Sequence, residues 1–282
     1  MVEPNAMNRV EPVKSKSVLQ EIAAHKRQEV DARKIQVPYQ TLKANLGNAT
    51  LPDIHGRFQA ALAPSGIQLI LEIKPASPSR GVLQTELDLD GILAAYNTHG
   101  SAISVLTDQK YFNGNLQLLQ QVASSTHLPV LCKDFILDEY QLLEACLAGA
   151  SAALLIVKML DETLLKQLFE ACIHLGLCPV VEVQDDTELN RALSLSPPVI
   201  LINNRNLDDL SISNTPTQTL APKIPPEIIV ISASGISSES DIDKLTPYAQ
   251  RFLIGSSLMQ TPPKALPEKL NLFLAAGSSP NS

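Results

Sequence analysis

The sequence predicts an α/β protein in which parallel strands close into a single (β/α)8 TIM barrel with an N-terminal helical extension. Eight short apolar segments follow one another over residues 68–254, and most are separated by segments with helical periodicity. Alternating strands and helices pair in parallel through right-handed crossovers, and a count of eight favours closure over an open sheet. No Gly-x-Gly-x-x-Gly motif follows the first strand, so the sequence does not support dinucleotide binding by an open sheet.

The N-terminal extension is predicted from one amphipathic pattern. A helix is expected over residues 18–34, where apolar residues such as Leu19 and Val30 alternate with charged residues such as Lys26. A loop that contains prolines follows, and then a short helix near residues 56–62.

The barrel elements follow in order. Strands are expected over residues 68–74, 102–107, 129–133, 152–157, 179–183, 199–203, 227–232 and 251–254. Helices are expected over residues 88–98, 116–124, 138–148, 161–175, 186–193, 238–245 and 263–275. The weakest unit lies between the sixth and seventh strands, where residues 211–224 contain prolines and show little periodicity.

The domain organisation is predicted to be simple. Residues 1–15 are expected to be a flexible tail, residues 16–276 a single barrel with its N-terminal helices, and residues 277–282 a C-terminal tail. A barrel domain accommodates a chain of 282 residues, so length does not require a second domain.

Composition excludes several classes of function. A formal net charge of −7 argues against nucleic acid as a partner, because phosphate backbones attract basic surfaces. No apolar run reaches the roughly 18 residues of a membrane span, and the N-terminus is too polar for a secretory signal. The four cysteines and five histidines show no metal-ligand spacing, so no metal is expected and the cysteines are expected to be reduced in a cytoplasmic protein.

The end of the first predicted strand contains the most informative residues. Glu72 and Lys74 are two residues apart in an otherwise apolar run, so their side chains lie on the same face of the strand. Burying such charges is costly unless they are paired or used. A barrel places its chemistry at the C-terminal strand ends, so these residues indicate an active site.

Other strand ends add groups of the same kind. Lys133 ends the third strand, Glu182 lies in the fifth and Asn203 ends the sixth. Glycines and serines follow the last two strands, where such barrels commonly bind phosphate through backbone N–H groups. Together the strand ends predict an acid–base site. A phosphate site is expected beside it, formed by Gly235, Gly255 and Ser256.

Six segments with these residues resemble indole-3-glycerol phosphate synthase. They are EIKPASPSRG (72–81), SVLTDQKYFNG (104–114), PVLCKDFILD (129–138), VEV (181–183), INNR (202–205) and FLIGSSLM (252–259). They occur in the order and spacing of that family, and the resemblance runs from the N-terminal helix to about Met259.

The resemblance implies a carbon–carbon lyase of tryptophan biosynthesis. Such an enzyme closes the pyrrole ring of 1-(2-carboxyphenylamino)-1-deoxyribulose 5-phosphate, with loss of CO₂ and then of water, and uses no cofactor. Lys133 corresponds to the general acid of ring closure and Glu182 to the base of dehydration. Lys74 corresponds to the lysine that binds the substrate carboxylate, and Glu72 to a carboxylate that orients these groups. No obligatory protein partner is implied.

The resemblance also implies a set of residues that contact substrate. They are Ser77, Phe112, Phe135, Leu154, Asn203, Arg205, Ser234, Gly235, Ile254, Gly255 and Ser256. The two phenylalanines and Leu154 correspond to the apolar wall around the anthranilate ring, and the serines and glycines to contacts with the phosphorylated substrate.

Three positions depart from the family pattern. Ala233 occupies a position where the family has a glutamate. Leu201 replaces the glycine that precedes Ile-Asn in the sixth strand of the family, and Asn206 replaces the aspartate that follows the arginine corresponding to Arg205. The alternative hypothesis is therefore a divergent paralogue that binds a phosphorylated ligand with weak or no synthase activity. A second alternative is a neighbouring barrel such as phosphoribosylanthranilate isomerase, which uses a cysteine and an aspartate; the two lysines and two glutamates argue against it.

Overall fold

The computed structural model describes residues 18–48, 56–77, 81–82, 87–207 and 211–276. The tails predicted over residues 1–15 and 277–282 lie outside the described residues, so the predicted domain boundaries stay a prediction.

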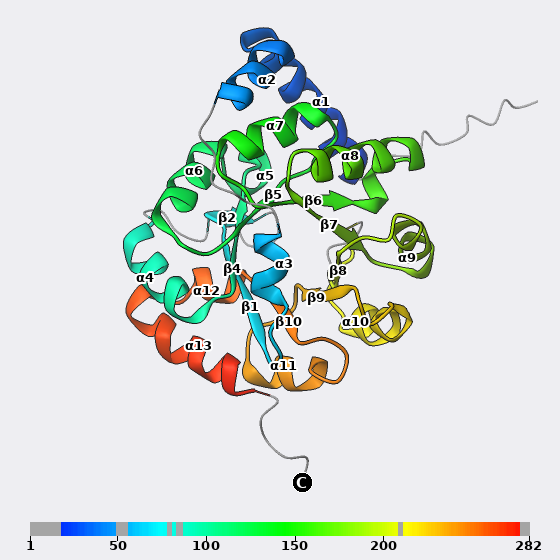
Figure 1. Ribbon diagram of the computed structural model, residues 1–282. Helices are drawn as coiled ribbons and strands as arrows, with labels where there is room; N and C mark the ends of the chain where they lie inside the picture. Colours follow the sequence, from blue (N-terminus) through cyan, green and yellow to red (C-terminus); the bar gives the residue numbers. More distant parts are fainter. Residues whose placement is uncertain (1–17, 49–55, 78–80, 83–86, 208–210, 277–282) are drawn as a thin grey trace, which may run out of the picture.

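The described residues form a closed barrel of eight parallel strands, which confirms the predicted fold class (Figure 1). The strands are β1 (Gln68–Ile73), β4 (Ala102–Leu106), β5 (Val130–Lys133), β6 (Ala152–Ile156), β7 (Cys178–Val183), β8 (Val199–Asn203), β9 (Ile229–Ala233) and β10 (Arg251–Ile254). Each strand pairs with its neighbours along the chain, and β10 closes the barrel against β1.

Helices surround the barrel on its outer face (Figure 1). They are α4 (Leu89–His99), α6 (Leu116–Ser125), α7 (Glu139–Leu147), α8 (Glu162–His174), α9 (Asp186–Leu193), α10 (Thr215–Leu220), α11 (Glu239–Leu245) and α13 (Leu266–Ala275). Several begin at an Asp or Asn whose side chain accepts a hydrogen bond from the first turn, as Asp161 does from the N–H of Leu164 at 2.8 Å. Helix α10 lies in the segment that showed little periodicity, and Pro216 stands in its first turn, where proline is compatible with a helix start.

Short elements lie in the connections. A two-stranded hairpin follows β1, built from β2 (Ala76–Ser77) and β3 (Gly81–Val82), and two short helices follow β4 and β10, namely α5 (Gln109–Phe112) and α12 (Ser256–Met259). The 3-10 turns are η1 (Val157–Met159), η2 (Ala221–Lys223) and η3 (Pro263–Ala265). The hairpin, α5 and η1 all follow the C-terminal ends of barrel strands, where they add backbone to one rim.

The barrel interior has an apolar core and, at the C-terminal ends of the strands, a layer of polar side chains. Because alternate residues of a strand share a face, Ile70, Leu131, Val180 and Leu201 fill the interior, each no more than 1% exposed. Two residues further along the same four strands are Glu72, Lys133, Glu182 and Asn203. Along these four strands, the interior face therefore changes within two residues from apolar packing residues to ionisable or polar ones.

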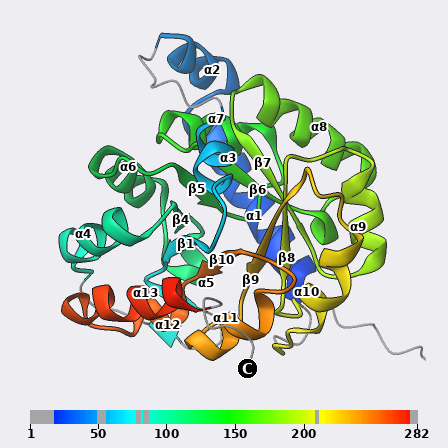
Figure 2. The ribbon, with the colours of Figure 1, turned by 60° about the horizontal axis from the view of Figure 1, so that its bottom comes forward.

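Two N-terminal helices cover opposite ends of this core. Helix α3 (Arg57–Leu62) lies over one end in Figure 1, where Phe58 and Leu62 are fully buried and Arg251, at the start of β10, donates to the carbonyl of Leu62 at 2.8 Å. Helix α1 (Val18–Gln36) runs diagonally behind the strands in Figure 2, and its Leu19 joins the interior cluster from the C-terminal ends.

The loop expected after α1 contains a helix instead. Helix α2 (Tyr39–Asn48) begins directly after Pro38, whose carbonyl accepts from the N–H of Leu42 at 3.0 Å. Proline is compatible with a helix start because its missing N–H would have no helical partner there. The helix is held by a small cluster in which Leu42 packs with Val30 and with Tyr140 of α7, a long-range contact that local periodicity does not reveal.

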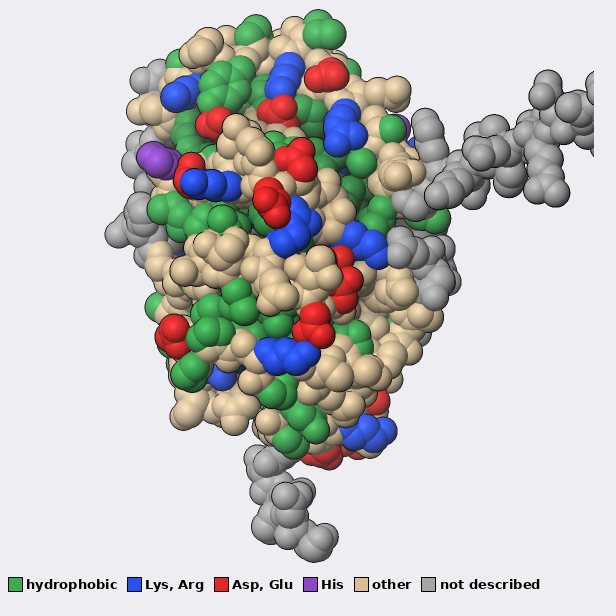
Figure 3. Space-filling model, turned by 90° about the vertical axis from the view of Figure 1, so that its right-hand side faces the viewer, with side chains coloured by type: hydrophobic (Ala, Val, Ile, Leu, Met, Phe, Trp, Pro, Cys, Tyr) green, Lys and Arg blue, Asp and Glu red, His purple; other side chains and the backbone are tan. Residues whose placement is uncertain are grey.

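The surface carries mixed charge on the side that lies at the right in Figure 1. Figure 3 shows acidic and basic side chains interspersed there, without a field of one sign. Within the described part of the chain, no helix has the length and apolar character that crossing a membrane requires.

Leu42→Ala tests how α2 is docked. We expect the free energy of unfolding to fall by about 2 kcal/mol, because the substitution leaves a cavity between α1, α2 and α7. Urea denaturation followed by circular dichroism measures this loss. Gln40→Ala, on the exposed face of the same helix, is the control and should change stability by less than about 0.5 kcal/mol; equal effects would show that Leu42 does not dock the helix.

Candidate active site

A cavity of about 580 Å³ opens at the C-terminal ends of the barrel strands. Described residues from seven of the eight strands or the segments that follow them line it, and only β6 contributes none. The predicted site residues among its lining are Glu72, Lys74, Phe112, Lys133, Glu182, Asn203, Arg205, Ser234, Gly235, Ile254, Gly255 and Ser256. The volume suits a small organic ligand of the size that such pockets enclose.

Glu72 is the centre of a buried ion-pair network. Its Oε1 lies 2.5 Å from Nζ of Lys74 and its Oε2 lies 3.8 Å from Nζ of Lys133, while only 3% of Glu72 is exposed. Burial by itself would raise the pKa of Glu72, but the two ammonium groups outweigh burial and hold the pKa below its ordinary value. Glu72 is therefore a fixed negative charge that orients two lysines from different strands.

Glu182 has the opposite electrostatic environment. Its Oε1 accepts a hydrogen bond from Nδ2 of Asn203 at 2.9 Å, and it is 2% exposed. Burial raises the pKa of Glu182 above its ordinary value, although Lys133 and the amide of Asn203 partly oppose that effect. A carboxyl with a raised pKa can exchange a proton near neutral pH, as a general acid or base must.

Asn203 is itself held in place by the backbone. Its Oδ1 accepts from the N–H of Arg205 at 3.0 Å while its Nδ2 donates to Glu182. The side-chain amide can be oriented with its nitrogen toward Glu182 because its oxygen is occupied by that N–H.

Close backbone approaches shape the side of the cavity formed by β9 and β10. A Cβ at Gly255 would lie 2.1 Å from Oε1 of Glu72, so a side chain there would displace the carboxylate. Ser234 and Gly235 both have positive φ, 70° and 82°, and turn the chain after β9. Helix α12 starts directly after Gly255. This corner presents backbone rather than bulky side chains, the arrangement that anion sites of such barrels use.

Three predicted residues are placed differently. Leu154 is 1% exposed and lies in the interior cluster with Phe135, and neither is among the residues that line the cavity. Phe135 supports the wall from behind, since its ring centroid lies 6.1 Å from that of Phe112. Ser77 lies in β2, and its side chain is outside what the structure describes. Their roles as ligand contacts stay predictions.

Lys269 is a cavity residue that the sequence did not indicate. It lies on α13, and its Nζ donates to the carbonyl of Ser257 at 3.1 Å and contacts Oγ1 of Thr261 at 3.4 Å. Burial lowers the pKa of Lys269. No local pattern distinguishes it from the other charges of an amphipathic helix, and only the packing of α13 against α4 and α11 brings it to the cavity.

The charge of the cavity is unbalanced. Among the described lining residues, Lys74, Lys133, Arg205 and Lys269 are basic, and Glu72 and Glu182 are acidic. The basic excess favours an anionic ligand. Elsewhere in the described chain, too, no three His, Cys, Asp or Glu side chains are arranged to hold a metal ion.

Two of the three departures from the expected pattern lie in or under the cavity. Ala233 lines it and is 3% exposed, so the position expected to carry a carboxylate carries a methyl group. Leu201 is fully buried in the barrel interior directly below Asn203. Asn206 lies outside the cavity lining, and its N–H donates to the carbonyl of Ser211 at 2.8 Å.

The fold and the site define a (β/α)8-barrel protein with two buried glutamates and an excess of basic side chains in a cavity at its C-terminal strand ends. Comparison with known proteins then identifies the family. The model of indole-3-glycerol phosphate synthase matches residues 19–267. The chain belongs to the indole-3-glycerol phosphate synthase family, which confirms the resemblance read from the sequence.

Two relatives illustrate the match. The chain is 41% identical over 246 residues to an indole-3-glycerol phosphate synthase of Burkholderia ambifaria, covering 86% of this chain and 94% of the relative. It is 40% identical over 255 residues to the tryptophan biosynthesis protein TrpCF of Yersinia pestis, covering 90% of this chain and 53% of the relative. The chain thus spans about half the length of the TrpCF relatives it matches. Nothing in these comparisons favours the phosphate-binding alternative.

A solved structure shows the same fold at low identity. The tryptophan synthase alpha subunit of Legionella pneumophila superposes with a TM-score of 0.58 at 14% identity, covering 78% of this chain and 97% of that one. At this identity the likeness concerns the barrel alone.

Glu182→Gln tests the buried carboxyl through stability. The raised pKa means that the folded protein holds this proton more tightly than the unfolded chain, so wild-type stability falls as pH rises through the folded-state pKa. The glutamine variant avoids this loss. We expect it to be more stable than wild type at pH 8, with the difference vanishing below the ordinary glutamate pKa, where both states are protonated. Urea unfolding across pH measures it. The exposed Glu170→Gln is the control; stability curves of Glu182→Gln and wild type that run parallel over the whole range would contradict the raised pKa.

Proposed function

We propose that this chain is an indole-3-glycerol-phosphate synthase, which converts 1-(2-carboxyphenylamino)-1-deoxyribulose 5-phosphate to indole-3-glycerol phosphate with loss of CO₂ and water. One observation carries the proposal beyond family membership. Lys133 of β5 and Glu182 of β7 line the same cavity from different strands, and the buried carboxylate of Glu72 pairs with Lys133 and Lys74.

Ring closure requires a proton donor at the substrate ketone. As the aromatic ring carbon attacks, negative charge develops on the carbonyl oxygen, and a positioned ammonium can neutralise it. We assign this role to Lys133, which is 20% exposed at its side chain and so can meet a ligand in the cavity. Its 3.8 Å approach to Glu72 helps to orient the ammonium.

Decarboxylation needs little from the protein apart from binding. The iminium formed by ring closure accepts the electrons released with CO₂, so the site must hold the ring and exclude water. Lys74 is assigned to the substrate carboxylate and Phe112 to the apolar wall beside the ring. The support is that both line the cavity and that Phe135 packs behind Phe112.

Dehydration requires a base on one side and an acid on the other. Glu182 is assigned as the base, because burial raises the pKa of its carboxyl and Asn203 fixes its orientation. An ammonium completes the pair by protonating the departing hydroxyl; Lys133 and Lys74 both face the cavity and are candidates.

The phosphate of the substrate is assigned to the corner of Gly235, Gly255 and Ser256. Backbone N–H groups there can approach an anion closely, and the basic excess of the cavity favours the substrate's phosphate and carboxylate together. Every group given a role lies on this chain, so we propose that the reaction needs no obligatory protein partner. The proposal includes a cytoplasmic location, supported by four free, buried cysteines.

Substitution of the acid and the base tests the mechanism. Lys133→Met and Glu182→Gln should each lower kcat by roughly 100-fold or more, the usual worth of a general acid or base. The fluorescence of the indole product gives the rate, with the carboxyphenylamino substrate added to purified protein. Lys110→Ala removes an exposed lysine of α5 outside the cavity lining and should change kcat less than twofold. Wild-type protein that binds the substrate without turnover would support a divergent phosphate-binding barrel instead.

Gly235→Ala tests the phosphate corner. The added methyl would meet Cγ2 of Ile212 at 2.7 Å and the residue would be strained at a φ of 82°. We expect KM to rise about tenfold, the equivalent of one charge-assisted hydrogen bond, with a smaller change in kcat. Gly149→Ala is the matched control, since Gly149 has a φ of 89° and a similar 2.9 Å contact but lies outside the cavity lining. Equal effects of the two variants on KM would remove Gly235 from the phosphate site.

A further inference from the structure

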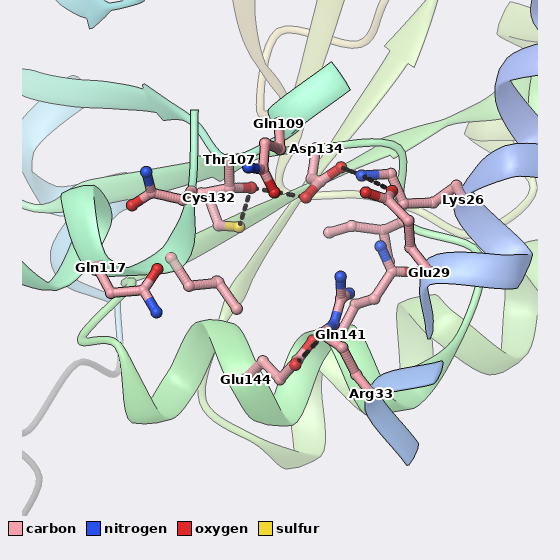
Figure 4. A pocket seen from close by; sticks show the side chains of 13 residues that line it. Lys26, Glu29, Arg33, Thr107, Gln109, Gln117, Cys132, Asp134, Gln141 and Glu144 are labelled. Carbon is pink, nitrogen blue, oxygen red and sulfur yellow. Dashed lines mark hydrogen bonds and ion pairs between the residues drawn. The ribbon is translucent and has the colours of Figure 1, made fainter. Parts of the chain in front are cut away.

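A lysine of the N-terminal extension is buried against two strand ends. Lys26 of α1 belongs to the charged residues of an amphipathic pattern, yet it is only 2% exposed. Its Nζ lies 2.7 Å from Oδ2 of Asp108, 3.0 Å from Oδ1 of Asp134 and 3.0 Å from Oε2 of Glu29. Figure 4 shows Lys26 extending from the helix toward Asp134. We call these four residues the Lys26 cluster.

Asp108 connects the cluster to the wall of the candidate active site. It follows β4 and caps α5, because its Oδ1 accepts from the N–H of Tyr111 at 2.7 Å. Its carbonyl accepts from the N–H of Gly114 at 2.9 Å, which closes the turn around α5. Phe112, a residue of the cavity lining, is the last residue of this helix. The position of Phe112 therefore depends on a carboxylate that Lys26 holds.

Asp134 connects the cluster to the proposed general acid. It directly follows Lys133, and its side chain is fixed on three sides, by Lys26, by the hydroxyl of Thr107 at 2.7 Å and by the N–H of Phe135 at 2.7 Å. Thr107 in turn donates its N–H to the carbonyl of Lys133 at 3.1 Å. Adjacent residues of a strand point to opposite faces, so Lys133 faces the cavity while Asp134 is anchored behind it.

A row of rings links the same elements. His25 of α1 lies edge-on to Tyr111 with centroids 6.3 Å apart, Tyr111 lies edge-on to Phe135 at 6.3 Å, and Phe135 packs on Phe112 at 6.1 Å. Helix α1 thus contacts the wall of the site through both charge and packing.

The Lys26 cluster lies outside the candidate active site. It borders a second cavity, of about 300 Å³, between α1, the ends of β4 and β5, and α7. Lys26, Glu29, Asp108 and Asp134 are all absent from the lining of the larger cavity. Lys26 therefore does not touch a ligand there, and any effect on catalysis must pass through the residues it holds.

Docking of α1 has other anchors. Arg33 forms an ion pair with Glu144 of α7 at 2.9 Å, and Lys34 forms one with Asp138 at 2.5 Å. Burying charge is costly, and an apolar contact of similar volume often stabilises a fold at least as well. The Arg33 and Lys34 pairs connect α1 to α7, an outer helix. The Lys26 cluster instead connects α1 to the ends of two strands that carry residues of the candidate site.

We propose that Lys26 is a positioning residue, which fixes the end of β5 and the β4–α5 turn so that Lys133 and Phe112 meet the substrate in the correct geometry. The inference rests on the proposed synthase function. Displacements of about 1 Å at a reacting group can reduce rates by up to 100-fold, so a clamp on two strand ends can influence turnover without contacting substrate.

Lys26→Met is the direct test, because it removes the ammonium and keeps most of the side-chain length. We expect kcat/KM to fall by about 10- to 100-fold. The double variant Arg33→Met/Glu144→Gln is the matched control, since it removes another link of α1 that does not reach the strand ends. The control should lower the melting temperature while leaving kcat and KM within twofold of wild type.

Hydrogen exchange by mass spectrometry gives a readout that does not require activity. We expect faster exchange in peptides that cover residues 106–114 and 132–137 of Lys26→Met, and unchanged exchange there in the control. A wild-type chain without turnover would refute the proposed function, and exchange would still decide whether Lys26 orders these turns. The inference is overturned if Lys26→Met keeps its kinetic constants within twofold, whatever its stability, or if exchange in both segments is unchanged.

If Lys26→Met does not fold, two single variants test the proposal instead. Asp134→Asn and Asp108→Asn each keep the oxygen that accepts the local N–H and remove one charge from the cluster. Asp134→Asn should lower kcat at least fivefold through Lys133, with KM within twofold. Asp108→Asn should raise KM at least fivefold through Phe112, with kcat within twofold. Unchanged constants in both variants would leave the cluster a purely structural role and refute the proposal.

Discussion

The buried carboxylate of Glu72 is the interaction on which the candidate site depends. An uncompensated charge at the top of an apolar barrel would be costly, and two lysines from different strands compensate it. The same contacts limit the movement of both ammonium groups, so the neutralisation of one buried charge also positions the proposed acids. Gly255 leaves the space that this arrangement needs, because a side chain at this position, directly after β10, would occupy the place of the carboxylate.

The two buried glutamates show how one scaffold creates different carboxyl groups. Both are at least 97% buried, since Glu72 is 3% exposed and Glu182 is 2% exposed. The pKa of Glu72 lies below its ordinary value because lysines outweigh burial, whereas the pKa of Glu182 lies above it because burial dominates and Asn203 opposes it only in part. Residues with environments that move their pKa values apart are suited to distinct acid–base roles.

The N-terminal helices close the barrel interior at both ends and connect to the site. Helix α3 covers the N-terminal ends of the strands, and α1 crosses the C-terminal ends, where the Lys26 cluster contacts β4 and β5. A barrel with open ends would expose interior apolar residues such as Ile70 of β1 and Leu201 of β8 to water. The extension therefore contributes to the core as well as to the rim, because α1 buries apolar residues such as Leu19 and Val30 together with Lys26.

The sequence by itself determined the eight strands, most outer helices and the residues that end the strands, because each depends on local periodicity, on caps or on the two-residue repeat that places Glu72 and Lys74 on one face. It also indicated the family through six segments of matching order. Only the tertiary structure decided that Leu154 and Phe135 lie outside the cavity lining, that Lys269 reaches it from the last helix, that α2 replaces the expected loop and that Lys26 is buried. These features depend on contacts between residues far apart in the chain, and local pattern carries no information about which distant side chain will neutralise a charge or cover an apolar face.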